Sequence, residues 1–122
     1  MKLFLLLGVI NGFLAVALGA FGAHGLEGKV SEKGLGQWEK AVNYQMFHTM
    51  ALFITALLLG KGASGMFTGA GWLFFAGILL FSGSLYVYAV SGVKTFAMIT
   101  PFGGVAFLIG WVLLGIGAMK VL

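Results

Sequence analysis

The sequence predicts an all-α, polytopic membrane protein with four transmembrane helices in a compact bundle. Of its 122 residues, 61% are hydrophobic and only 8% are charged, and the mean hydropathy is +1.09. A soluble domain of this size must present more polar surface to water. The apolar residues also fall into four runs, each near the roughly 20 residues that cross a bilayer as a helix. These runs cover about residues 3–23, 41–59, 66–90 and 101–119.

Two other architectures do not fit this pattern. A membrane β-barrel shows segments of alternating polarity separated by turns, whereas the runs here do not alternate. A soluble helical bundle needs a charged face on each helix, and stretches such as LLFSGSLYVYAV have none. Because the four spans use nearly all of residues 1–122, we expect a single four-helix membrane domain.

The first run could be mistaken for a secretory signal, because Lys2 precedes an apolar stretch that ends in small residues. A signal has an apolar region of roughly 7–15 residues, and this run is longer, at about 21. We therefore expect residues 3–23 to be a retained span.

The segment 25–40 differs from the other connections because it contains all three acidic residues of the chain. Ser31 can cap a helix, and Leu35, Trp38 and Val42 follow at helical spacing. We expect this helix to lie partly in the membrane interface, with Trp38 at headgroup depth, and to continue into the second span.

The start of the fourth span has two interpretations. In the favoured one, Thr100 caps a helix whose first residue is Pro101, where the missing N–H is not needed. In the alternative, a longer helix runs through Pro101 and is kinked there.

Small residues recur at heptad spacing, in steps of three, four or seven, in three of the spans. Because membrane helices associate by close backbone approach, these stripes predict helix contacts in a left-handed bundle. A glycine-lined pore is the less favoured alternative. The stripes are Gly8, Gly12, Ala15, Gly19 and Gly22; Gly65, Gly69, Ala76 and Gly83; and Gly103, Ala106, Gly110 and Gly117.

Polar residues gather on one face of the second span. On a helix, Tyr44, Gln45, His48 and Thr55 fall within an arc of about 100°. The first span offers Asn11 at the edge of its glycine stripe, and His24 follows that span. If the two spans are antiparallel neighbours, Asn11 approaches the Thr55 end of this face and His24 approaches its Tyr44 end. We therefore predict a polar seam between spans one and two.

This seam has a structural and a functional interpretation. Interhelical hydrogen bonds commonly serve only to fix the rotation of membrane helices. A functional seam would hold a small aqueous cavity or a ligand, with His48 as proton carrier or ligand-orienting group. A metal site of His24, His48 and a loop glutamate is disfavoured, because neither HxxxH nor HxxE spacing occurs.

Several function classes are excluded or disfavoured. The chain has no cysteine, which excludes disulfides and thiolate chemistry. The absence of arginine and of a basic face argues against nucleic-acid binding. The spans contain no carboxylate for a proton relay or for hydrolysis. We therefore expect neither an enzyme nor a bound cofactor.

Four stretches, GAFGAHGL, WEKAVNYQMFHTMALF, GILLFSGSLY and TPFGGVAFLIGW, together resemble a family of small four-span membrane proteins of unknown function. The family is widespread in bacteria and has an animal transmembrane counterpart. The resemblance covers essentially the whole chain and implies a protein of the bacterial inner membrane. It supplies no substrate, catalytic residue or cofactor. Phe47 and Thr49 depart from the tyrosine and alanine that the family pattern leads us to expect.

These observations favour a small solute or ion path, or a site that binds a small molecule or lipid at the seam. Because four short helices enclose little volume, conduction would require an oligomer, so we expect a homo-oligomer in the lipid bilayer. The alternative is a structural or interaction subunit in which the seam only aligns helices.

Overall fold

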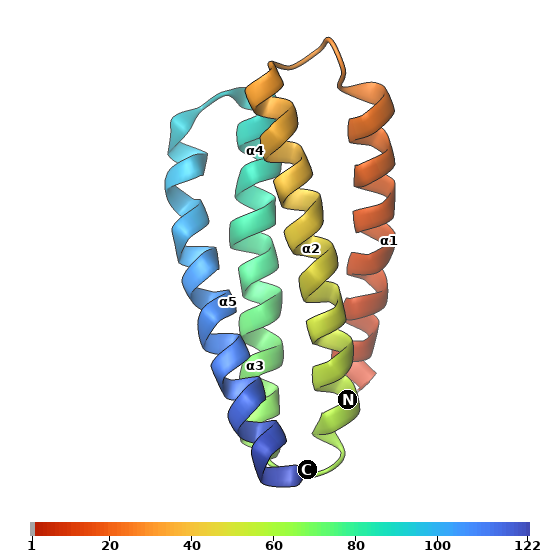
Figure 1. Cartoon of the computed structure of the whole chain (residues 1–122), viewed down its shortest axis with the longest axis vertical. Coiled ribbons are helices and arrows are strands. Elements are labelled where there is room, and N and C mark those ends of the chain that lie inside the picture. The colour runs from red at the N-terminus through yellow and green to blue at the C-terminus, as the bar shows by residue number, and fades with distance from the viewer. Residues whose placement is uncertain (1) are drawn as a thin grey trace.

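The computed structural model describes residues 2–122, and helices cover nearly all of them (Figure 1). The third span is one continuous helix in which a π-helical turn, η1, separates two α-helical parts. The elements are α1 (Lys2–Gly25), α2 (Glu32–Leu59), α3 (Ser64–Gly77), η1 (Ile78–Ser82), α4 (Gly83–Ser91) and α5 (Lys94–Val121).

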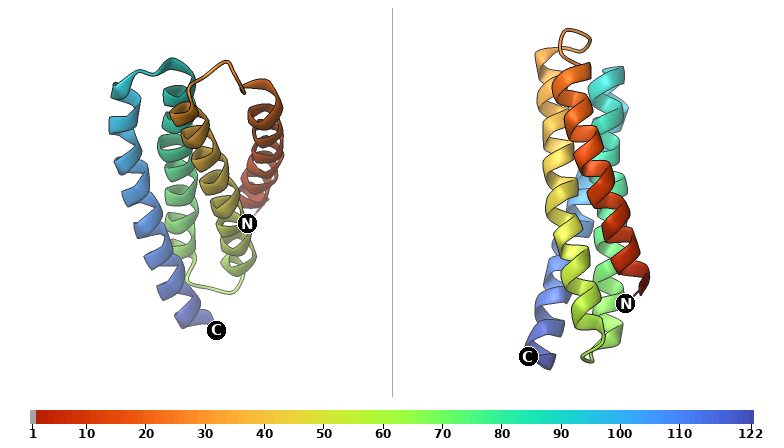
Figure 2. Two further views of the ribbon diagram at one scale, coloured as in Figure 1. Left: turned by 45° about the horizontal axis from the view of Figure 1, so that its top comes forward. Right: turned by 90° about the vertical axis from the view of Figure 1, so that its right-hand side faces the viewer.

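Four helical segments are long and apolar enough to cross a membrane: Lys2–Gly25, Glu32–Leu59, Ser64–Ser91 and Lys94–Val121. They run up and down beside one another, with the chain ends and the α2–α3 connection at the same end (Figures 1 and 2). The predicted all-α class with four apolar spans is therefore confirmed.

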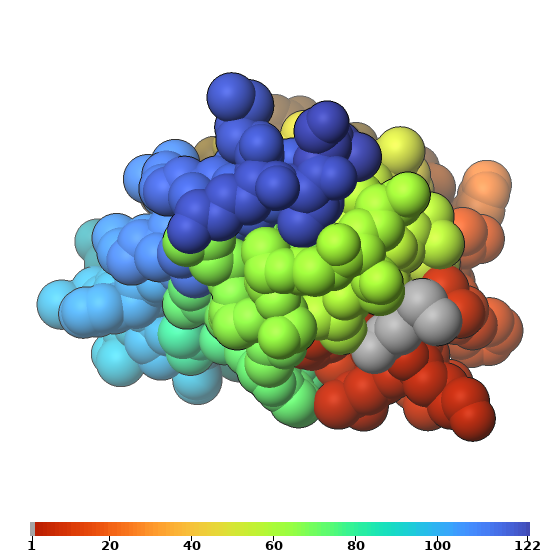
Figure 3. All heavy atoms as spheres, turned by 90° about the horizontal axis from the view of Figure 1, so that it is seen from below, coloured from red at the N-terminus to blue at the C-terminus, as the bar shows by residue number. Residues whose placement is uncertain are grey.

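The bundle has two central and two outer segments. The α2 helix packs against α1 on one side and against α3, η1 and α4 on another, while α5 packs against α3, η1 and α4. Figure 3 shows the result from below, with the green central chain between the blue end of α5 and the red start of α1. Consequently, α2 and the third span form the core, where Leu52, Phe67 and Phe74 are fully buried.

The small-residue stripe of α1 packs against α2, as predicted. A Cβ atom built on Gly8 would lie 2.7 Å from the Phe53 ring, and one on Gly22 would lie 2.3 Å from the Trp38 indole nitrogen. Since no real side chain tolerates such distances, the glycines permit this helix spacing.

The stripe predicted for the fourth span is also confirmed, because Gly103, Ala106, Gly110 and Gly117 are all buried. In the third span, by contrast, Gly65 is exposed, and the close contacts fall on Gly71 and Gly77. A Cβ on Gly71 would meet the Phe4 ring, and one on Gly77 would meet the Phe107 ring. The stripe proposed for this span is therefore wrong as a set. This span is central and packs on more than one side, because Gly69 and Gly77 meet side chains of α5 whereas Gly71 meets Phe4 of α1.

The connection after α1 is shorter than the sequence suggested. Ser31 caps α2 as predicted, with its hydroxyl oxygen accepting a hydrogen bond from the Gly34 N–H at 3.0 Å. However, α2 begins at Glu32 and stands upright beside α1 (Figure 1). Trp38 is buried, and its indole N–H donates to the Leu18 carbonyl at 2.8 Å. Most of segment 25–40 is thus part of the second span.

The favoured start of the fourth span is wrong, and the alternative is correct. The α5 helix begins at Lys94 and contains Pro101 in its interior. Gly92, with φ of 70°, ends α4, which leaves only a tight turn before α5. Thr100 does not cap the helix; instead, its hydroxyl bonds the Ser84 hydroxyl of α4. This bond ties the first turns of α5 to the neighbouring helix despite the proline.

Candidate functional site

Two separate polar clusters occupy the middle of the bundle, and both are built on α2. The first, which we call the amide cluster, contains Asn11, Gln45 and Tyr86. The Gln45 side-chain amide donates to Asn11 Oδ1 at 3.0 Å, and the Tyr86 hydroxyl donates to Gln45 Oε1 at 2.7 Å. The Asn11 amide in turn donates to the Leu7 carbonyl at 2.8 Å. This cluster links α1, α2 and α4.

The second cluster, which we call the aromatic cluster, is centred on His48. The Tyr44 carbonyl, which can only accept, lies 2.8 Å from His48 Nδ1, so that nitrogen carries the hydrogen. His48 Nε2 is then free to accept the indole N–H of Trp111 at 3.0 Å. The imidazole also stacks on the Phe107 ring, with centroids 3.5 Å apart and planes at 7°. His48 is therefore a neutral imidazole that links α2 to α5.

The structure brings together only part of the predicted seam. Asn11 meets Gln45 between spans one and two as proposed, but it meets the middle of α2 and not its Thr55 end. Thr55 instead bonds the Ala51 carbonyl of its own helix. The short connection 26–31 sets the relative height of α1 and α2 and places Asn11 opposite Gln45.

The other predicted seam residues face elsewhere. Tyr44 is 42% exposed and stacks on Phe81, with ring centroids 4.4 Å apart. His24 is exposed at the end of α1. The prediction of one seam running from Asn11 to His48 between spans one and two is therefore wrong for His48 and Tyr44. His48 faces α5 and Tyr44 faces Phe81 of η1, because a wide polar arc on one helix can serve more than one neighbour.

The buried polar groups are satisfied within the protein. Within residues 2–122, no buried side-chain nitrogen or oxygen lacks a hydrogen-bond partner. Ser82, for example, donates to the Ala41 carbonyl of α2 at 2.8 Å. Over the same residues, no three histidine, cysteine, aspartate or glutamate side chains come together as a metal site would require.

A groove of about 710 Å³ lies beside the aromatic cluster. Its walls come from α2 and α5, whose backbones make little direct contact. Aromatic side chains line much of it, with the His48 ring and the Asn43 amide as polar groups. The lining residues are Asn43, Tyr44, Phe47, His48, Phe81, Pro101, Gly104, Val105, Phe107, Leu108 and Trp111.

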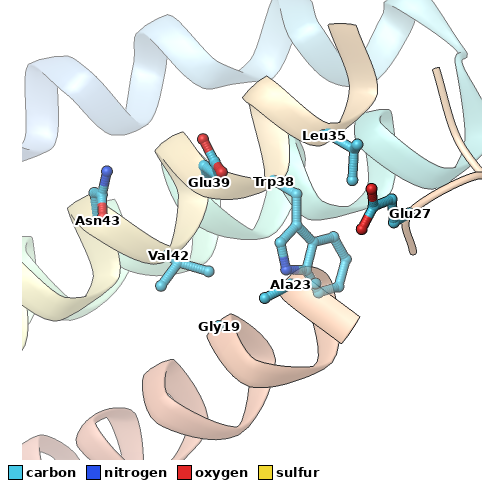
Figure 4. Close-up of a pocket in the computed structure, with 9 residues that line it drawn as sticks. Gly19, Ala23, Glu27, Leu35, Trp38, Glu39, Val42 and Asn43 are labelled. Atoms are coloured by element: carbon cyan, nitrogen blue, oxygen red, sulfur yellow. The ribbon is translucent and has the colours of Figure 1, made fainter. Parts of the chain in front are cut away.

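Two further hollows flank the amide cluster. One, of about 510 Å³, lies between the end of α1 and the start of α2 (Figure 4). There Trp38 points from α2 toward Ala23, whereas Glu39 and Asn43 lie farther from α1. The other, of about 420 Å³, contains Asn11, Gln45 and Tyr86 among mainly apolar residues of α1 and the third span.

Sequence reasoning missed Trp111 and Tyr86, which complete the two clusters. Each carries one polar group within an apolar run, and a buried indole N–H or phenol O–H needs an acceptor. The need for an acceptor was therefore the signal in the sequence that Trp111 and Tyr86 would contact the polar residues of the second span.

The fold and its satisfied polar interior define a polytopic membrane protein with four helical spans. Residues 18–104 match the family described as "Protein of unknown function (DUF423)", and the chain belongs to this family. It is 53% identical to the UPF0382 membrane protein YwdK of Bacillus subtilis, over all of both chains. It is 51% identical to the UPF0382 membrane protein SAB0533 of Staphylococcus aureus, over 98% of each chain. No solved structure matches the chain.

Proposed function

We propose that this protein binds one lipidic molecule in the groove between α2 and α5, without catalysing a reaction, and that it does so in the bacterial plasma membrane. The observation that carries the proposal is the groove itself. Its volume of about 710 Å³ lies within the range of roughly 300–1,000 Å³ typical of small-molecule sites. Such sites combine apolar walls with a few polar groups, as this groove does.

The α5 wall of the groove supports the proposal of a lipidic occupant. Gly104 lines the wall, and the nearest atoms to a Cβ built on it belong to the Phe81 ring at 3.9 Å. Pro101, one turn earlier, presents no backbone N–H. The result is an apolar wall that suits a hydrocarbon chain. The His48 ring, which also lines the groove, is the polar group beside it.

A solute or ion path through one copy receives less support. Bulky side chains fill the centre, where Leu52, Phe67 and Phe74 are fully buried. The polar groups are also bonded to one another, so water or an ion would have to displace these bonds.

A structural or interaction role is the second candidate. It is favoured by one specific observation: the amide cluster links three helices by direct hydrogen bonds. Such a cluster can act only to fix helix rotation. This role predicts that filling the groove has no effect beyond stability.

The Gly104→Leu variant tests lipid binding, because its side chain would occupy the groove. Gly115→Leu is the matched control: it is on the same helix, outside the groove, with nothing within 4 Å of its Cβ position. We expect native mass spectrometry of the purified protein to show one retained lipid for the wild type and for Gly115→Leu. Gly104→Leu should lose it while keeping the thermal stability of the control. Equal lipid retention by the two variants would overturn the proposal.

A further inference from the structure

The α2 helix carries a heptad pattern of exposed residues, one of which, Phe47, also contacts Trp111 of α5 at the edge of the groove. Its members follow one another in steps of four, three, four, three and four, which places them within an arc of about 80°. All six are exposed. We call this set the α2 ridge: Gly36, Lys40, Asn43, Phe47, Met50 and Ile54.

Asn43 stands out on this ridge. It lies near the start of the apolar run of α2, one turn after Lys40, and, as Figure 4 shows, away from α1. Its amide stands outside both polar clusters, unlike that of Gln45. An amide that faces hydrocarbon without a partner is costly. A face that met only lipid tails would be more stable with an apolar residue here.

We infer that a second copy of this chain docks on the α2 ridge and forms a parallel homodimer around Asn43. Copies inserted in the same orientation bring their α2 helices together in parallel, related by a two-fold axis. Asparagine both donates and accepts hydrogen bonds, so Asn43 can pair with Asn43 of the partner subunit. A single asparagine in a heptad seam commonly specifies such a paired arrangement.

Charge complementarity at the end of the ridge supports the same partner. If Lys40 and Phe47 occupy a positions of the heptad, Asn43 and Met50 occupy d positions, and Glu39 occupies a g position. In a parallel pair, a g residue lies beside the a residue of the partner helix. Glu39 therefore faces Lys40 of the partner subunit, and the reverse holds across the axis. This pairing offsets the repulsion between the two lysines.

Cysteine cross-linking in membranes tests the predicted contact. Because the chain has no cysteine, single substitutions report on one position each. Asn43→Cys, Phe47→Cys and Met50→Cys should form disulfide-linked dimers under mild oxidation. Val16→Cys on α1 and Met98→Cys on α5 are exposed controls away from the ridge and should give few. Absent cross-links, or equal cross-links at ridge and control positions, would overturn the proposal.

The role of the Asn43 amide is tested separately, in vesicles. Energy transfer between labelled copies, followed as lipid dilutes the protein, measures the dimer dissociation constant. Asn43→Leu should raise this constant roughly 3- to 30-fold, which corresponds to the range for one hydrogen bond between membrane helices. Asn43→Gln should restore most of the affinity, and Gly104→Leu should leave it unchanged. An unchanged constant for Asn43→Leu, or a wild type that is monomeric throughout, would contradict the inference.

Discussion

The two sides of α2 are built differently. Toward α1, small residues let the helices approach closely, and a Cβ on Gly12 would already be 3.5 Å from the Thr49 methyl group. Toward α5, the backbones make little direct contact, and aromatic rings span the distance. The single side-chain hydrogen bond described between these two helices joins Trp111 and His48.

The contact with α1 therefore fixes how the helices are aligned, whereas the contact with α5 leaves room for a ligand. The α1–α2 contact combines close packing with the Asn11–Gln45 bond, so both the spacing and the rotation of the helices are fixed. The α2–α5 contact depends on side chains that can change rotamer. The groove beside α5 is accordingly larger than the hollow between α1 and α2, and we expect substitutions on the two sides of α2 to have different consequences.

Gly22→Ala is the substitution that we expect to destabilise the α1–α2 contact most. Its added methyl group would lie 2.3 Å from the Trp38 indole nitrogen, so the indole must move and lose its bond to Leu18. Overpacking and the lost bond together should cost about 2–4 kcal/mol. Gly12→Ala is the matched control and should cost less than about 1 kcal/mol. Thermal unfolding in detergent measures both, and similar losses would contradict the proposed close contact.

A second test removes the centre of the amide cluster. Gln45→Leu leaves the Asn11 oxygen and the Tyr86 hydroxyl without their partners, which should cost about 1–3 kcal/mol. The triple variant Asn11→Leu, Gln45→Leu, Tyr86→Phe removes the stranded groups as well and should recover most of that loss. A lower free energy of unfolding for the triple variant than for Gln45→Leu would contradict this expectation, and would mean that the cluster stabilises the fold beyond satisfying its own polar groups.

The smallest expected effect on stability comes from His48→Phe, on the side of α2 that faces α5. Phenylalanine keeps the stacking on Phe107 but leaves the Trp111 N–H without its acceptor, at a cost of about 1 kcal/mol. We expect a shift in Trp111 fluorescence and weaker lipid retention while the fold remains intact. An unchanged melting temperature, fluorescence spectrum and lipid content would remove His48 from the candidate site.

The sequence was sufficient to predict the fold where the helical period is uniform. The stripes of the first and fourth spans obey the 3.6-residue repeat, so their packing faces could be read directly. The third span is central and contacts α1 and α5 through different glycines, Gly71 and Gly77, so no single stripe describes its packing. Pro101 was placed at a helix start by its local preference, but the tight turn at Gly92 and the packing of α5 decided otherwise.

The candidate site was predictable only in part, for a geometric reason. Gln45 and His48 are about 60° apart around α2, close enough to be read as one polar face. Which neighbour each meets depends on the arrangement of all the helices, and the sequence of one span does not contain that information. Trp111 and Tyr86, which complete the two clusters, lie 63 and 41 residues from their partners.

The π-helical turn and Pro101 lie at the same level of the bundle, where Phe81 contacts the α5 backbone near Gly103. Each replaces a regular α-helical hydrogen bond with something weaker. The groove is thus flanked by two departures from regular α-helical hydrogen bonding, one in α5 and one in the third span. We expect its width to adapt to occupants of different thickness while the close pairing of α1 with α2 is kept.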